Sequence, residues 1–172
     1  MKKMLLGMLV SASFVACTNS EHKNDSVEQK STPIEHIYKP TYTDNFKIGD
    51  PKNVLLAEQF HKLLFEKDFK QAGDLIADTV LFYNEDGSTL KGKAAVLDYM
   101  QKNFAGITFK NYQIAAILPV VGENGHQWVD IWDEAEIVTP DGKSQKMQWV
   151  DAFRFENGKI VHFIGFGKVL KN

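Results

Sequence analysis

The sequence predicts an α+β fold in which three helices cover one face of a curved antiparallel β-sheet. With one short exception, apolar residues between positions 51 and 106 recur at helical spacing. From residue 108 to residue 169 the apolar period is two, which is typical of strands. Glycine-bearing turns separate these later segments, so neighbouring strands should pair as hairpins. Because helices come first and strands last, an alternating parallel array is excluded.

Three segments of the first half carry helix signals. Asp50 can cap the first helix and Pro51 can occupy its first position, which favours a helix over residues 52–66. A second short helix, from Phe69 to Ile76, follows almost without a break. A third helix opens at Gly92-Lys93 and closes at Gly106, a glycine typical of helix C-termini.

Five segments carry strand signals. The first is a short β-branched and aromatic run that ends in a turn. The other four are long, alternate apolar and polar residues, and are separated by turns of glycine, asparagine and aspartate. The predicted strands are Thr79 to Tyr83, Thr108 to Val120, Gln127 to Val138, Lys146 to Phe155 and Ile160 to Val169.

Composition bounds the class of protein. The chain has 172 residues, is 44% hydrophobic and carries a formal net charge of -2, which is typical of one globular domain. It lacks the basic excess that neutralises phosphates, so we expect no nucleic-acid partner. A single cysteine excludes an internal disulfide framework, and the five histidines show no zinc-ligand spacing. We expect no metal and no cofactor.

The N-terminus predicts export from the cytoplasm. Lys2 and Lys3 precede an apolar run, Met4 to Val10, and a small-residue stretch that ends at Cys17, so residues 1–16 form a signal peptide. Phe14-Val15-Ala16-Cys17 resembles the lipobox of bacterial lipoproteins, although phenylalanine replaces the usual leucine. The resemblance implies that Cys17 is acylated and anchors the protein in the bacterial cell envelope. A cleavable secretory peptide with an incidental cysteine is the alternative.

Between the signal peptide and the domain lies a polar segment. Residues 17–50, which begin with the lipidated cysteine, are rich in Asn, Ser, Thr, Lys and Asp and show no sustained period. We interpret them as a flexible tether. The domain itself is expected over residues 51–172.

Several motifs of this domain resemble one superfamily. They are Phe82-Tyr83-Asn84, Asp86-Gly87, Leu90 to Lys93 and the stretch from Asp151 to Ile160. Together with the order of the elements, they resemble the nuclear transport factor 2-like (NTF2-like) superfamily, and most of all its SnoaL-like polyketide cyclases and ketosteroid isomerases. The resemblance implies a cone-shaped sheet with three N-terminal helices packed on one face. Function does not follow, because this fold serves enzymes, ligand binders and dimerisation modules.

The family's chemistry carries over to one residue. In the isomerases an aspartic acid on the penultimate strand donates a hydrogen bond to the substrate oxygen, and the matching motif puts Asp151 in that role. The alternative is a buried aspartate bonded to a neighbouring strand or to pocket water. The isomerase tyrosine and base correspond to Phe60 and Asn84, and the cyclase His-x-Asp to Phe163 and Gly165. Since these cannot transfer protons, we expect a domain without catalytic activity.

The strand over residues 127–138 has two dissimilar faces. Trp128, Asp130 and Trp132 lie on one face, and the Val/Ile residues that alternate with them lie on the other. Family register favours the tryptophans on the concave side, with the Val/Ile set outside as a homodimer surface. The reverse arrangement is the alternative. The expected cavity residues are Tyr83, Trp128, Asp130, Trp132, Trp149, Asp151 and Phe163, whereas His61, His126 and His162 are interpreted as structural.

These observations favour a lipid-anchored domain, expected to be a homodimer, whose polar-aromatic cavity binds a small hydrophobic or amphipathic ligand without catalysis. One alternative is an isomerase, cyclase or hydratase that acts on a small carbonyl compound. In that enzyme Asp151 would be the oxyanion donor. The other alternative is a structural dimerisation module, whose cavity would be filled by side chains.

Overall fold

A computed structural model describes residues 34–84 and 86–171 of the chain. The chain divides into two units, residues 1–37 and residues 38–172, and the second contains every helix and strand described below. The predicted signal peptide and Cys17 lie outside the described residues. Within the described part of the chain, no helix is both long and apolar enough to cross a membrane.

The three predicted helices are present. They are α1 (Pro51–Phe65), α2 (Phe69–Asp74) and α3 (Lys93–Phe104). The Asp50 side chain caps α1 as predicted, because it accepts a hydrogen bond of 2.9 Å from the Lys52 backbone N–H. α2 ends earlier than the sequence suggested.

Seven strands form one sheet in the order β1-β4-β5-β6-β7-β2-β3. The hairpins β4–β5, β5–β6 and β6–β7 are antiparallel, as predicted. β2 instead pairs with β7 in parallel, since no hairpin connects these two strands and fixes their direction. The bounds are β1 (Phe46–Ile48), β2 (Ile76–Tyr83), β3 (Thr89–Lys91), β4 (Thr108–Gly122), β5 (Gln127–Val138), β6 (Ser144–Glu156) and β7 (Lys159–Val169).

Two short strands and one boundary differ from the prediction. β1 and β3 have three residues each, too few to show an alternation. β1 belongs to the segment interpreted as a tether, yet Phe46 pairs with Gly122 of β4. Ile76 opens β2 rather than closing a helix, because it is buried and pairs with Ile160 of β7.

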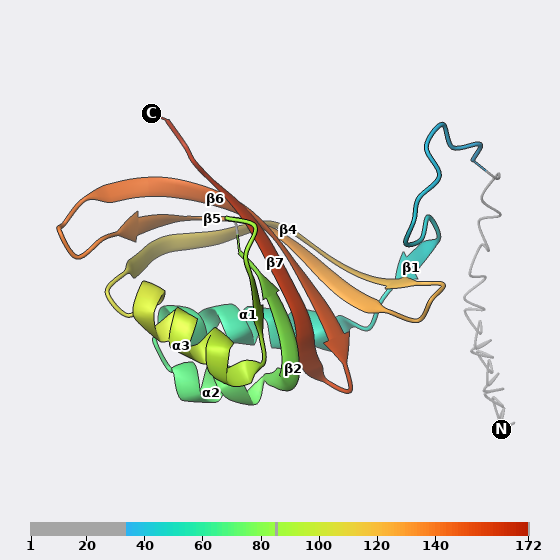
Figure 1. Ribbon diagram of the computed structural model, residues 1–172. Helices are drawn as coiled ribbons and strands as arrows, with labels where there is room; N and C mark the ends of the chain where they lie inside the picture. Colours follow the sequence, from blue (N-terminus) through green and yellow to red (C-terminus); the bar gives the residue numbers. More distant parts are fainter. Residues whose placement is uncertain (1–33, 85, 172) are drawn as a thin grey trace, which may run out of the picture. The chain divides into compact units, whose positions relative to one another are not determined.

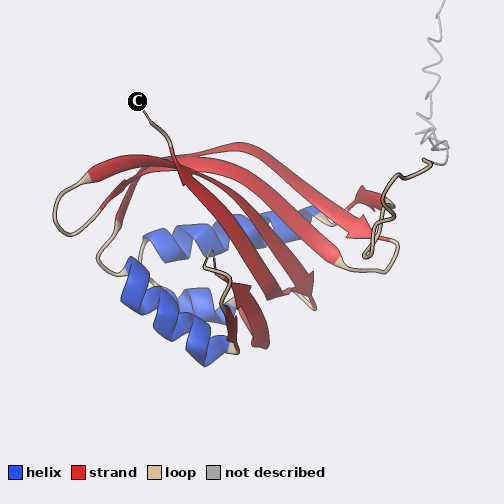
Figure 2. Cartoon of the chain, turned by 45° about the horizontal axis from the view of Figure 1, so that its top comes forward, coloured by secondary structure: helices blue, strands red, loops and turns tan. Residues whose placement is uncertain are grey.

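The helices lie against the concave face of the curved sheet (Figures 1 and 2). α1 crosses beneath the middle strands, and α2 and α3 continue the same layer. The core lies between these two layers and has Phe60 of α1, Val129 and Ile131 of β5, and Phe153 of β6 among its fully buried side chains. The fold is therefore an α+β cone, as the sequence predicted.

The faces of β5 are the reverse of those expected. Its buried residues are the odd-numbered set from Val129 to Ile137, which faces the helices. Val138 pairs with Ser144 across the turn, so odd-numbered residues of β5 and β6 share one face. The family register used for the prediction was one residue off, and a slip of one residue exchanges the faces of a strand. The placement of Trp128, Asp130 and Trp132 in the cavity is therefore wrong, and so is the placement of the Val/Ile set on an outer homodimer surface, because that set is buried. The alternative arrangement is correct.

Candidate functional site

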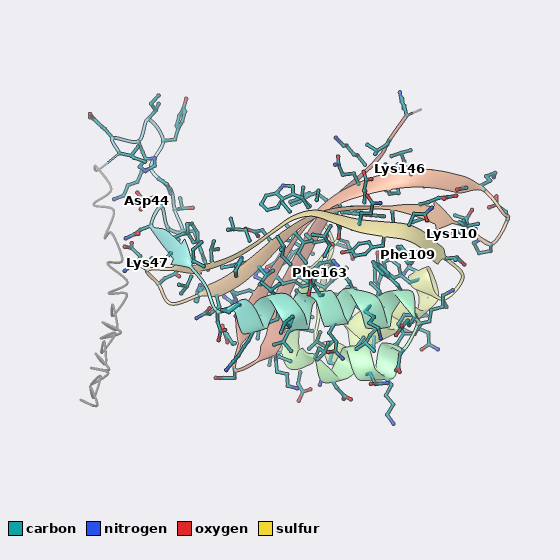
Figure 3. All side chains as sticks on the ribbon, turned by 180° about the vertical axis from the view of Figure 1, so that it is seen from behind. Asp44, Lys47, Phe109, Lys110, Lys146 and Phe163 are labelled. Carbon is teal, nitrogen blue, oxygen red and sulfur yellow. The ribbon has the colours of Figure 1, made fainter. Side chains whose placement is uncertain are left out.

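A cavity of about 440 Å³ lies between the concave face of the sheet and the helices. Its wall is mostly aromatic and apolar. Residues of α1, of the region from β2 to α3 and of the long strands line it. Figure 3 shows Phe109 and Phe163 on the side of the sheet that faces the helices. The aromatic lining residues are Phe65, Phe82, Tyr83, Tyr99, Phe104, Phe109, Trp149 and Phe163.

Four of the seven expected cavity residues line this space. They are Tyr83, Trp149, Asp151 and Phe163. Trp128, Asp130 and Trp132 lie on the other face of the sheet. There the Trp128 indole N–H donates to the Tyr42 hydroxyl at 3.0 Å, and the Trp128 ring lies 5.5 Å from that of His162.

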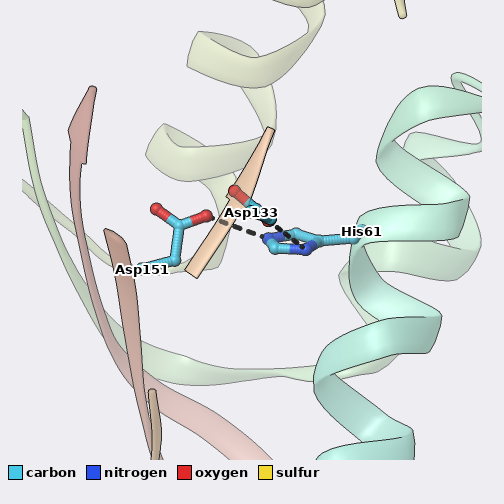
Figure 4. Close-up of side chains that lie close together, drawn as sticks. All are labelled: His61, Asp133 and Asp151. Carbon is cyan, nitrogen blue, oxygen red and sulfur yellow. Dashed lines mark ion pairs between the residues drawn. The ribbon is translucent and has the colours of Figure 1, made fainter. Parts of the chain in front are cut away.

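At one end of the cavity, four polar side chains from four elements form a buried cluster. His61 of α1 lies between the two carboxylates of Asp133 (β5) and Asp151 (β6), as Figure 4 shows. His61 Nε2 is 3.1 Å from Asp151 Oδ2, and His61 Nδ1 is 2.9 Å from the hydroxyl of Tyr112 of β4. That hydroxyl donates to Asp133 Oδ2 at 2.7 Å. The four groups form one continuous chain of polar contacts, which consists of two hydrogen bonds and the His61–Asp151 ion-pair contact.

Aromatic packing fixes the His61 ring. It stacks on Phe65, one helical turn further along α1, with ring centroids 5.6 Å apart. It also meets Phe153 of β6 edge to face at 5.3 Å. Since these rings leave the imidazole little freedom, its two nitrogens point in fixed directions.

A bulge in β4 accompanies the placement of Tyr112. The pairing of β4 with β5 shifts between Lys110 and Gln113, and Asn111 there has a φ of 52°. Bulges re-aim the side chains beside them. Tyr112 lies edge to face with His61, with ring centroids 5.9 Å apart, so its hydroxyl reaches the cluster.

Asp151 owes its position to a glycine on the next strand. Asp151 pairs with Gly165 of β7, and a Cβ added at Gly165 would clash with Asp151 Oδ1. The carboxyl therefore occupies the space that a side chain at position 165 would fill. By resemblance to the cyclases, Gly165 takes the place of their aspartate. The Asp151 carboxyl of β6 therefore lies where β7 itself has no carboxyl.

Burial controls the ionisation of the cluster. It raises the pKa of Asp133 to about 6, while the hydrogen bond from Tyr112 and the nearness of His61 act in the opposite direction. Burial, together with Asp133, raises the pKa of Tyr112 far above its ordinary value, so its hydroxyl stays a donor. The second oxygen of Asp133, Oδ1, is buried and has no hydrogen-bond partner in the described part of the chain.

His61, Tyr112 and Asp133 were missed as site residues. His61 was interpreted as structural because its partners lie more than 50 positions away in the sequence. One signal for Asp133 was available: it is the only charged residue in an otherwise apolar alternating set, Val129, Ile131, Ala135 and Ile137. An acid at a buried strand position requires a partner or a function.

The cluster also contains side-chain atoms that can ligate a metal ion. One ligand atom from each of His61, Asp133 and Asp151 lies within 4.8 Å of the others. Both nitrogens of His61 already face a protein partner, so a metal would have to displace one of them. The cluster is better arranged to share protons than to coordinate an ion.

The curved sheet, the helical layer on its concave face and the cavity between them define an NTF2-like domain. The family model of the SnoaL-like domain matches residues 57–163, more than half of the chain. The chain belongs to the SnoaL-like domain family. No curated protein matches the chain significantly.

Solved structures of the same superfamily share the fold. A candidate polyketide cyclase from Xanthomonas campestris pv. campestris is 15% identical with a TM-score of 0.54, covering 66% of this chain and 88% of that one. An LEH-like epoxide hydrolase of M. tuberculosis is also 15% identical, with a TM-score of 0.53 and coverages of 68% and 83%. A candidate ketosteroid isomerase from Kribbella flavida is 13% identical, with a TM-score of 0.55 and coverages of 73% and 84%. At these identities the likeness extends to the fold alone.

Proposed function

We propose that this chain is a lipid-anchored protein of the bacterial cell envelope whose SnoaL-like domain binds a small hydrophobic or amphipathic molecule. The observation that carries the proposal is the aromatic cavity of about 440 Å³ with a polar cluster at one end. Cavities of this size, mostly apolar with few polar groups, are typical of small-molecule sites. A purely structural dimerisation module would instead fill this space with side chains.

The binding proposal is tested by a thermal-shift screen of the purified chain with hydrophobic and amphipathic molecules. A ligand of the cavity should raise the melting temperature, because it binds only the folded state. Trp149→Ala, in the cavity wall, should reduce the shift, whereas Trp128→Ala, on the outer face, should leave it unchanged. Equal loss in both variants, or no shift with any compound, would contradict a cavity ligand.

The membrane anchor is proposed from the sequence around Cys17, which lies outside the described residues. Acyl chains on Cys17 would hold the protein at a membrane surface, since two or more chains anchor stably. The test is fractionation of cells that produce the full chain. The wild type should sediment with membranes, and Cys17→Ser should be released or remain unprocessed; a Cys17→Ser protein that resists a carbonate wash would refute the anchor.

A homodimer is proposed for the outer face of the sheet. There Trp132, Val150 and Phe166 pair directly across β5, β6 and β7. They are exposed by 37%, 37% and 62%, respectively, which makes an apolar row across the strands. An apolar row of this kind suits a second copy of the same surface.

A second candidate function is proton transfer, as in an isomerase, cyclase or hydratase that acts on a small carbonyl compound. The placement of two carboxyl groups in one cavity wall favours it, with Asp151 only 3.1 Å from His61 Nε2. Asp151 would donate a proton to the substrate oxygen and recover it from His61. The proton that leaves the carbon next to the carbonyl would go to Asp133 Oδ1, which has no hydrogen-bond partner among the described residues. Solvent deuterium should then appear beside the carbonyl of a substrate in a screened panel, and His61→Gln should abolish this exchange without loss of folding.

A further inference from the structure

The charged groups of the described cavity wall are all carboxylates, which accept hydrogen bonds when ionised. Among the described residues that line it, the charged ones are Asp86, Asp133 and Asp151, and none is a lysine, arginine or histidine. A carboxylate or phosphate ligand would therefore meet like charge and find no cation. The wall predicts a ligand that donates hydrogen bonds or carries positive charge.

The buried cluster holds more acidic than basic side chains. Asp133 and Asp151 both lie near His61, at 3.6 Å and 3.1 Å. His61 can carry at most one positive charge, so the cluster is net negative whenever both carboxyl groups are ionised. In the cavity wall, no described basic residue offsets this charge.

Two acceptor atoms of the wall are buried and have no hydrogen-bond partner among residues 34–84 and 86–171. Asp133 Oδ1 belongs to a side chain that is only 2% exposed, and its other oxygen is taken by Tyr112. Asn84 Oδ1, at the end of β2, is the second. An unpaired buried acceptor costs free energy, and a donor group of a ligand would remove that cost. Asp86, which is exposed and also lines the cavity, adds a carboxylate at its opening.

We propose that the cavity selects amphipathic molecules that carry an amine or ammonium group, with the cation at the part of the wall that Asp133 and Asp151 line and the apolar body among the aromatic rings. This inference rests on the proposed function, because it names the ligand class of the same cavity. The rings contribute directly, since the faces of Trp149, Tyr83 and Phe109 attract a cation electrostatically. An ammonium group also supplies donors for the buried acceptors Asp133 Oδ1 and Asn84 Oδ1, which have no partner among the described residues.

A metal ion fits the wall less well than an organic cation. It would need an open ligand position from His61, but both ring nitrogens are engaged, one by Tyr112 and one by Asp151. It would also leave most of the 440 Å³ without an occupant. An organic ammonium ion uses the acceptors and the aromatic wall at once.

The test compares three probes that share one apolar body and differ in the head group: phenylbutylamine, phenylbutanol and phenylbutyrate. Titration calorimetry of the full chain at pH 8 should give an affinity for the amine at least about tenfold higher than for the alcohol. The butyrate should bind most weakly. Zinc and manganese chloride are titrated in parallel, and neither should displace the amine.

Two variants locate the selectivity. Asp133→Asn should reduce the preference for the amine over the alcohol to about twofold or less, with binding of the alcohol retained. Asp130→Asn on the opposite face of the same strand is the matched control, and it should keep the full preference. Because Asp133→Asn could disturb the cluster, Asp86→Asn at the cavity opening gives a second, independent reduction.

The possible results distinguish the cation preference from the more general proposal of a cavity ligand. Equal affinities for amine, alcohol and butyrate would overturn the cation preference and leave the cavity ligand standing. No binding of any probe would count against the amine proposal and against the proposed function alike. Displacement of the amine by zinc or manganese, or an unchanged preference in both Asp133→Asn and Asp86→Asn, would overturn the assignment of the cation to this end of the cavity.

Discussion

The two faces of the sheet carry similar residues with different consequences. The concave face has Trp149 and Asp133, and the outer face of the same two neighbouring strands has Trp132 and Asp130. Inside, the aspartate joins a proton-sharing chain and the tryptophan lines a cavity. Outside, the tryptophan is part of an exposed apolar row. Residue type alone therefore does not define a site here, because the pairing register decides which aspartate contacts His61.

The largest change in stability that we expect comes from the ionisation of Asp133 on the concave face. The pKa of Asp133 is about 6 in the folded chain, above its ordinary value, so the folded state binds the proton more tightly than the unfolded state. Its contribution to stability is therefore complete below about pH 4 and is lost as the pH rises through about 6, by about 3 kcal/mol. The groups that face Asp133 are Tyr112 of β4, His61 of α1 and Asp151 of β6.

Urea unfolding between pH 4 and 8 measures this effect as a difference between two proteins. The free energy of unfolding of the wild type minus that of Asp133→Asn should fall across this range. Subtracting the variant removes the contributions of other carboxylates. A difference that is independent of pH would show that Asp133 does not ionise within the folded cluster.

Removal of a tyrosine hydroxyl should lower the free energy of unfolding more on the concave face than on the outer face, and by less than the ionisation of Asp133 does. Tyr112→Phe removes the donor to a buried carboxylate and the partner of His61 Nδ1, which should cost about 2 kcal/mol of unfolding free energy. Tyr42→Phe removes a hydroxyl from the outer face, where Tyr42 is 48% exposed, and should cost about 0.5 kcal/mol or less. Thermal or urea unfolding checks both. Equal costs would mean that the cluster is no more stabilising than a surface contact.

The prediction for Gly165 concerns the close approach of two strands on the concave face. Gly165→Ala puts a methyl group against Asp151 Oδ1, and His61 contacts the other oxygen of the same carboxyl, Oδ2, so we expect a loss of about 1–2 kcal/mol. Asp151→Ala frees the space, so the same glycine substitution in that background should cost clearly less. If the double-mutant cycle shows no coupling, the carboxyl does not occupy the position beside Gly165.

The fold could be predicted from the sequence more completely than the site. Caps such as Asp50 and the period-two segments are local signals, so α1 and the long strands were predicted to within a few residues. β1 was missed because a three-residue edge strand is stabilised only by its partner β4. The parallel pairing of β2 with β7 likewise depends on the tertiary fold.

The site could be predicted only in part, for a physical reason. Asp151 was found because a local motif marks it, Trp149 followed from strand alternation, and Phe163 followed from the family register of the last strand. His61, Tyr112 and Asp133 meet through helix packing, a bulge and a register, none of which has a local signal. The turn between β5 and β6 spans residues 139–143, and an error of one residue in it was enough to exchange Asp133 for Asp130.

The smallest expected effect on stability concerns the outer face, and it is the one that tests the proposed homodimer. Phe166 is 62% exposed on β7, so Phe166→Gln should change the unfolding free energy of the monomer by about 0.5 kcal/mol or less. Phe163, three residues earlier, faces the cavity and stacks on Phe153 at 4.7 Å, so Phe163→Gln should be clearly more destabilising.

If the apolar row around Trp132 and Val150 holds two copies together, Phe166→Gln should weaken the dimer by about tenfold or more in sedimentation equilibrium, because a buried aromatic anchor is lost from the interface. A dimer unchanged by Phe166→Gln would move the interface away from this face, and a wild type that stays monomeric at high concentration would remove the dimer altogether.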